Sequence, residues 1–161
     1  MRRRCDALKL LQEEFLMKKI LLSCFFSALA SSGLAADFSG FYKCELLDNS
    51  DGYFAATLAL KLNPAASKTE RGYTSYDIDF HVTGIPYPYT GIAAARGNDL
   101  ALYFESTGEN KNPDDRGVGI VSVVMDQDKS GREIVTLHKF YYEKSYKGSG
   151  NFGFENCTRV N

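Results

Sequence analysis

Residues 73–82 read YTSYDIDFHV and carry the clearest structural signal in the chain. The apolar residues of this stretch alternate with polar ones, and they are Tyr76, Ile78, Phe80 and Val82. The polar residues between them are Ser75, Asp77, Asp79 and His81. Because neighbouring side chains of a strand point to opposite faces, this period of two predicts a β-strand with one buried face.

Seven further segments rich in Tyr, Phe, Val, Ile and Thr lie between turn-forming residues on either side of this stretch. They are residues 38–47, 53–62, 89–95, 100–106, 117–125, 132–143 and 151–160. No segment shows a sustained helical period. The pattern predicts an all-β fold in which eight strands form an antiparallel up-and-down meander that closes into a barrel. A β-sandwich is the alternative.

The first 35 residues have the features of a signal peptide. Met17 and two lysines form a basic start, residues 20–34 are mostly apolar, and Gly33-Leu34-Ala35 fits a cleavage site. We expect translation to start at Met17 and cleavage to follow Ala35. Residues 36–161 then form a single domain, which we expect to be periplasmic or secreted.

Two cysteines, Cys44 and Cys157, remain after the expected cleavage. An even count in an oxidising compartment favours a disulfide, with a metal site or a catalytic thiol as weaker alternatives. The two residues fall in the first and last predicted strands, which become neighbours when a barrel closes. In the chain-entropy model, a disulfide that closes a loop of this length stabilises the folded state by about 4 to 5 kcal/mol. Any strain in the native disulfide reduces this figure.

Charge limits the classes of partner. Residues 1–35 contain six of the 19 Lys and Arg residues and three of the 20 Asp and Glu residues, so the remainder has a formal charge of −4. This sign argues against nucleic acid or an anionic membrane as the main partner. The apolar run in the leader is too short and too serine-rich to remain as a membrane span after cleavage.

The opening Ser39-Gly40-Phe41-Tyr42 resembles the Gly-x-Trp start of the calycin-type barrels, the lipocalins and avidins, with Tyr in the Trp position. Strand number and meander order are also similar. The resemblance implies a packing role for Gly40 and Tyr42. It does not imply biotin binding, because that pocket depends on tryptophan and this chain has none.

A second likeness, to the periplasmic lysozyme-inhibitor barrels, rests on Tyr42-Lys43-Cys44 and Asn156-Cys157. The central Ser-Gly signature of those inhibitors has no counterpart here. The likeness implies inhibition of a hydrolase such as lysozyme as an alternative function.

Two groups of residues have the chemistry of a metal site. Asp77, Asp79 and His81 share one strand face and offer a metal or proton site, which is the basis for an alternative enzymatic or metal-binding function; the competing interpretation is a solvated outer wall. Asp126, Asp128 and Ser130 resemble the start of a calcium loop, but Leu137 stands where a bidentate Glu is needed, so we favour a hairpin turn. Residues 109–115 are also rich in oxygen, in a spacing that matches no known site.

The connection 83–91 is the strongest candidate for binding. Pro86 and Pro88 restrict it, while Tyr87 and Tyr89 offer large amphipathic surfaces that serve either as a partner-binding tip or as a plug over the barrel end. A second aromatic and basic cluster contains Tyr141, Tyr142, Tyr146 and Lys147. Strand alternation places the first two of these on opposite faces.

No nucleophile elbow, catalytic set or cofactor motif is present in the sequence, so we predict no catalytic residues and no cofactor. The interpretation is a non-enzymatic exported binding module, with connections 83–91 and 107–116 contacting a protein or a small apolar ligand. A hollow interior would favour a small-molecule carrier, and a filled one recognition by loops. The sequence does not indicate an oligomeric state.

Overall fold

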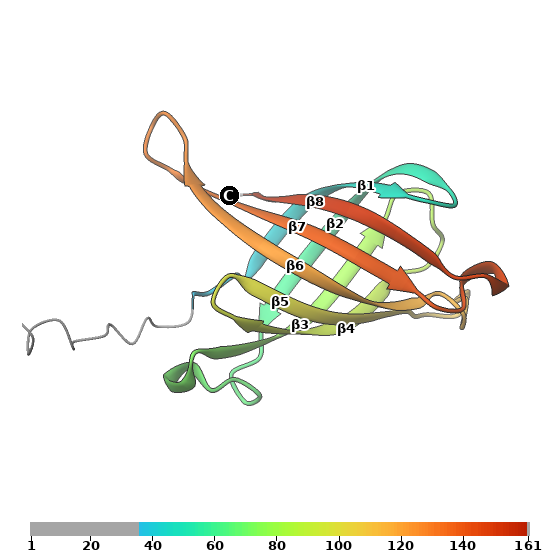
Figure 1. Cartoon of the computed structure of the whole chain (residues 1–161), viewed down its shortest axis with the longest axis horizontal. Helices are drawn as coiled ribbons and strands as arrows, with labels where there is room; N and C mark the ends of the chain where they lie inside the picture. Colours follow the sequence, from blue (N-terminus) through green and yellow to red (C-terminus); the bar gives the residue numbers. More distant parts are fainter. Residues whose placement is uncertain (1–35, 161) are drawn as a thin grey trace, which may run out of the picture. The chain divides into compact units, whose positions relative to one another are not determined.

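The computed structural model describes residues 36–160, which form a closed barrel of eight antiparallel strands (Figure 1). Each strand pairs with the next along the chain, and the last pairs with the first. The strands are β1 (Gly40–Asp48), β2 (Gly52–Leu62), β3 (Tyr73–Val82), β4 (Tyr89–Arg96), β5 (Asp99–Ser106), β6 (Arg116–Gln127), β7 (Glu133–Glu143) and β8 (Asn151–Val160). The predicted all-β meander is confirmed, and the β-sandwich alternative is wrong. The predicted leader lies outside the described residues.

Strand positions follow the sequence pattern closely. The predicted ends of all eight strands agree with the observed ends to within two residues, and those of β3 and β8 are identical. Two short 3-10 helices, η1 (Thr69–Arg71) and η2 (Tyr146–Gly148), lie in connections. Turn-forming residues therefore delimit this fold well, because the connections between strands are rich in Gly, Pro, Asn, Asp and Ser.

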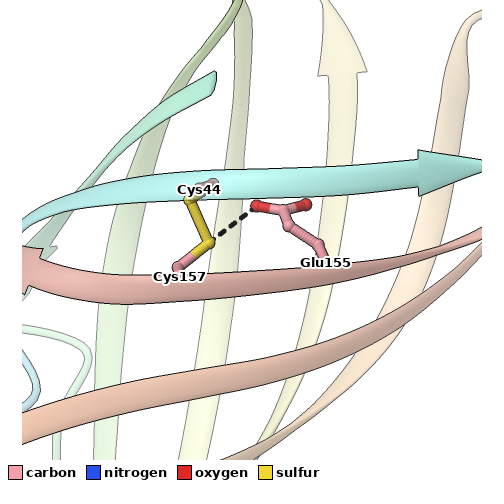
Figure 2. Close-up of side chains that lie close together, drawn as sticks. All are labelled: Cys44, Glu155 and Cys157. Carbon is pink, nitrogen blue, oxygen red and sulfur yellow. Dashed lines mark hydrogen bonds between the residues drawn. A yellow bond between two sulfur atoms is a disulfide. The ribbon is translucent and has the colours of Figure 1, made fainter. Parts of the chain in front are cut away.

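The barrel closes between β1 and β8, where Cys44 lies directly opposite Cys157. The two side chains point into the barrel and form the predicted disulfide (Figure 2). It joins residues 113 positions apart in the chain. The covalent bond thus reinforces the one strand pair that has no local connection.

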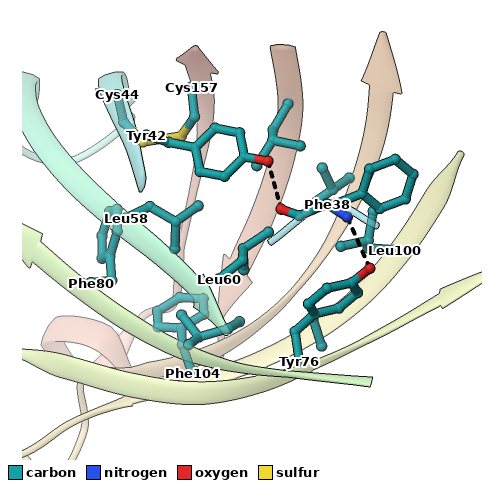
Figure 3. Close-up of a cluster of buried hydrophobic side chains, with 14 of the residues drawn as sticks. Phe38, Tyr42, Cys44, Leu58, Leu60, Tyr76, Phe80, Leu100, Phe104 and Cys157 are labelled. Carbon is teal, nitrogen blue, oxygen red and sulfur yellow. Dashed lines mark hydrogen bonds between the residues drawn. A yellow bond between two sulfur atoms is a disulfide. The ribbon is translucent and has the colours of Figure 1, made fainter. Parts of the chain in front are cut away.

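Most of the interior is filled by inward-facing apolar side chains from all eight strands (Figure 3). One end is packed shut by Phe38, whose backbone N–H donates to the Tyr76 hydroxyl and whose carbonyl accepts from the Tyr42 hydroxyl. The Arg159 guanidinium lies 5.8 Å from the centre of the Tyr42 ring. Gly40 has a φ of +152°, which other residues rarely adopt, and a Cβ there would also meet the Arg159 side chain at 3.2 Å. We call this the closed end.

The opposite end carries the connections 49–51, 83–88, 107–115 and 144–150, and we call it the open end (Figure 1). In an up-and-down barrel alternate connections lie at the same end. The two connections proposed from the sequence as binding loops are therefore neighbours.

Candidate binding site

An interior cavity of about 60 Å³ lies beneath the connections of the open end. A second gap, of about 20 Å³, lies deeper among apolar side chains. A single water needs roughly 10 to 15 Å³ by this measure, and a drug-sized ligand several hundred. The open-end cavity is therefore large enough for a few waters or a small chemical group.

Aromatic rings form one wall of this cavity. Phe80, Tyr89, Phe104 and Tyr141 follow one another edge to face, with ring centres 5.9, 6.1 and 5.9 Å apart. Leu46, Phe54, Val82 and Ile85 add an aliphatic and aromatic surface nearer the connections. Such walls favour an apolar group or an organic cation.

An ion pair lies at the floor of the cavity. Lys139 of β7 pairs with Glu155 of β8, and the two side chains are 10% and 0% exposed. The Lys139 ammonium lies 4.5 Å from the Phe80 ring centre and 5.3 Å from that of Tyr141. Burial raises the pKa of Glu155, and the neighbouring Lys139 acts against that rise. One Glu155 carboxylate oxygen also contacts Cys157 Sγ at 2.9 Å (Figure 2).

Asp115 lies at the upper wall, where its own connection turns it inward. Its backbone N–H donates to the Asn112 carbonyl, and its carbonyl accepts from the N–H of Ser106. The hydroxyls of Tyr87 and Tyr89 donate to Asp115 Oδ2 at 2.9 and 2.7 Å. Burial, and next the Asp115 carboxylate, raise the pKa of both tyrosines. The structure thus joins the predicted tyrosines to one acid.

The proline-rich connection 83–88 folds over the barrel end. Ile85 and Tyr87 are half-buried against the core, whereas Pro86 is exposed. The Pro88 carbonyl accepts hydrogen bonds from the N–H and hydroxyl of Thr107, which ties the two binding connections together. The two tyrosines therefore partly cover the open end, as the plug alternative predicts. Tyr89 also lines the cavity, and Tyr87 donates to Asp115, which lines it.

A second acidic group faces Asp115 from β1 and β7. Asp48 ends β1, and its Oδ1 accepts from the backbone of the following turn. Its Oδ2 accepts from the Tyr141 hydroxyl at 2.7 Å and from Asn151. The amide of Asn151 also donates to Glu143 at 3.1 Å. Burial, and next a hydrogen bond with Asp115, raise the pKa of Glu143 to about 8.

The aromatic and basic cluster of the 144–150 connection lies at the mouth. Tyr146 and Lys147 both donate to the Asp51 carboxylate, joining this connection to the β1–β2 turn. These two bonds, Lys147 first, lower the pKa of Asp51. Tyr141 points inward and Tyr142 outward, as alternation predicts.

The predicted metal candidates lie elsewhere. Asp77, Asp79 and His81 are on the outer wall, where Lys61 pairs with Asp79, and none of the three lines the two interior spaces. In the β6–β7 hairpin the Asp128 carboxylate accepts from Ser130 and Arg132, in the arrangement of an ordinary turn. Asp126 Oδ1 accepts from the N–H of Gln127.

One cluster of potential metal ligands occurs within residues 36–160, and it consists of Cys44, Glu155 and Cys157. The two sulfurs form the disulfide and so do not offer thiolates. Among the described residues no helix is long and apolar enough to cross a bilayer.

Comparison of the chain with protein-family models, curated proteins and solved structures found no match. Its class is therefore defined by the structure itself. The described residues form a closed, eight-stranded antiparallel β-barrel, consistent with a calycin-like barrel, with a mostly filled interior and an acidic cavity at its open end.

Proposed function

We propose that this chain is an exported, non-enzymatic binding module that recognises its partner at the open end of the barrel. One observation carries the proposal. Four connections converge around the open-end cavity, whereas Phe38, Tyr42 and Arg159 pack the other end shut. Ligand sites commonly occupy the mouths of β-barrels.

The size of the cavity narrows the mode of binding. At about 60 Å³ it is too small to enclose the several-hundred-Å³ ligand of a lipocalin-like carrier. A small group that enters from the mouth, while the connections contact the rest of the partner, fits the space better. This favours recognition by loops over enclosed transport.

The proposal includes two further points, namely that the chain is exported and that its barrel is of calycin-like origin. The Cys44–Cys157 disulfide supports an oxidising compartment, periplasmic or secreted. Strand order and the buried position of Tyr42 at the closed end support a calycin-like origin.

Inhibition of a hydrolase such as lysozyme is the second candidate. The joining of the two cysteines on which that likeness rests, together with the mostly filled interior, favours it. Loss of lysozyme activity at a one-to-one ratio of the purified protein would support it, and unchanged activity at excess protein would exclude that target.

The test of the binding function uses the full chain, expressed and purified after any processing by the cell. Envelope extract is cross-linked to the wild-type protein, to Tyr87→Ser at the open end, and to Lys68→Ser in an exposed closed-end connection. Native mass spectrometry of the same samples detects retained small molecules. We expect a partner or ligand with wild type and Lys68→Ser that is lost with Tyr87→Ser. Equal capture by all three proteins, or nothing bound to any of them, would contradict the proposal.

A further inference from the structure

The acids around the open-end cavity outnumber the cations that balance them. Five acidic side chains line the cavity, namely Asp48, Asp51, Asp115, Glu143 and Glu155. Glu155 pairs with Lys139 and Asp51 with Lys147. Within residues 36–160, no ion pair involves the other three.

Asp115 provides a second, independent observation that points to a ligand. The residue is 2% exposed, and while its Oδ2 accepts two tyrosine hydroxyls, its Oδ1 is buried with no hydrogen-bond donor among the fixed N–H and O–H groups of the described chain. A buried carboxylate oxygen left without a donor is costly. Within the described chain, a protonated Glu143 can supply that hydrogen.

The surroundings point to an organic cation rather than a metal ion. Calcium needs six to eight converging oxygens, whereas Asp48, Asp115 and Glu143 are not among the described groups whose ligand atoms converge within 4.8 Å. The remaining wall is aromatic and aliphatic. A primary ammonium group has three N–H donors, and one such group, that of Lys139, is already held in this interior by a carboxylate and aromatic rings.

We propose that the open-end cavity binds a primary ammonium group carried on a short apolar stem. The ammonium donates to Asp115 and Glu143, with the Asp48 carboxylate as a further negative charge nearby, and the stem passes Phe54, Val82 and Ile85 towards the mouth. The inference rests on the proposed function, because it names the chemistry recognised at the same end. Either a free alkylamine or a lysine side chain of a protein partner has this chemistry.

Entry of the ammonium displaces a proton. Because the pKa of Glu143 is raised to about 8, its carboxyl is largely protonated at neutral pH, and a neighbouring cation favours its ionised form. Binding therefore releases up to one proton, and the affinity rises with pH towards about 8. The polar and charged groups near Glu143 are Asp48, Tyr87, Tyr89, Asp115, Lys139, Tyr141, Asn151 and Glu155.

Calorimetric titration with n-butylamine, 1-butanol and butyrate tests the inference, since the three probes share a stem and differ in the head group. We expect butylamine alone to bind. Asp115→Asn should weaken its binding by about tenfold or more, while Asp114→Asn, next in sequence and exposed, should leave it within about twofold. Butylamine binding no tighter than butanol binding, or insensitive to Asp115→Asn, would overturn the inference.

A second variant tests the inference in case Asp115→Asn does not fold. Glu143→Gln keeps the shape of the protonated acid, and thermal unfolding checks that it folds. Titration in two buffers of different ionisation enthalpy should show proton release for the wild type and none for Glu143→Gln. Equal proton release by both proteins would contradict the assigned role of Glu143.

Nα-acetyl-lysine methylamide separates the two sources of the ammonium. Tighter binding of this probe than of butylamine assigns the site to a protein side chain, and the reverse order assigns it to a free amine. If neither binds while Tyr87→Ser still abolishes partner capture, the amine inference fails and the proposed function stands. If capture does not depend on the open end either, both fail.

Discussion

Lys139 and Glu155 lie directly opposite each other on β7 and β8 and form an ion pair inside the barrel. Two charges in a largely apolar interior depend on each other, because removal of one leaves the other buried without compensation. This relationship leads to the first of four predictions about the fold and the cavity.

Lys139→Met should lower the free energy of unfolding by about 3 to 5 kcal/mol, because Glu155 then remains as an unpaired buried acid. Urea denaturation measures the loss. The paired change Lys139→Met with Glu155→Leu should restore much of it. Lys61→Met, which breaks the exposed pair with Asp79, is the matched control and should change little. Equal effects of the two lysine substitutions would contradict the prediction.

The stability of the folded domain should fall as pH rises from about 4.5 to about 8. The folded state keeps the Glu143 proton up to a pKa of about 8, whereas the unfolded chain releases it near the ordinary glutamate pKa of 4.5. The unfolded state thus binds fewer protons in this window, and unfolding becomes easier as pH rises. Urea titrations at a series of pH values measure the slope, which Glu143→Gln should reduce. An identical slope in the variant would argue against the raised pKa.

The disulfide should stabilise the barrel without being the only bond that closes it. Non-reducing peptide mapping should find Cys44 linked to Cys157. Reduction should lower stability by at most about 4 to 5 kcal/mol, while the β1–β8 ladder keeps the barrel closed. The reductant should have no further effect on the Cys44→Ser, Cys157→Ser double variant. Loss of β-sheet circular dichroism on reduction would contradict a ladder that closes by itself.

Gly153 should be intolerant of a side chain. It lies opposite Tyr141 across β7 and β8, and an added Cβ would fall 2.4 Å from the Tyr141 ring. Gly153→Ala should therefore cost about 1 to 3 kcal/mol and disturb the bond from Tyr141 to Asp48. Chemical denaturation measures this loss. The same alanine placed in a Tyr141→Leu background should cost less, and an unchanged cost would show that the ring is not the cause.

The fold was predictable because its strands are separated by strong turn signals and because β3 alternates clearly. Its cysteines also occupy the first and last strands, which a barrel brings together. Tyr87 and Tyr89 were predictable as open-end residues because prolines and aromatic rings mark their connection. Packing then decided how they are used, since both donate to Asp115.

The acidic cavity was not predictable, because β7 and β8 do not follow the usual pattern of apolar inside and polar outside. Lys139, Glu143 and Glu155 point inward, while Phe140, Tyr142 and Phe154 alternate with them on the outer wall. The alternation of side chains along a strand separates its two faces, but it does not show which face points into the barrel. The partners that make the inward charges tolerable, such as Asn151 and the aromatic rings, come from other strands and become neighbours only after the barrel closes.

The bond between Cys44 and Cys157 makes the eight strands a covalent ring as well as a hydrogen-bonded one. A protease that cuts any connection between β1 and β8 opens the chain once but releases no fragment, because both pieces stay attached through the sulfur atoms. Such a cut would be visible on a denaturing gel only after reduction. The connections around the cavity can therefore be nicked while the barrel remains a single covalent molecule.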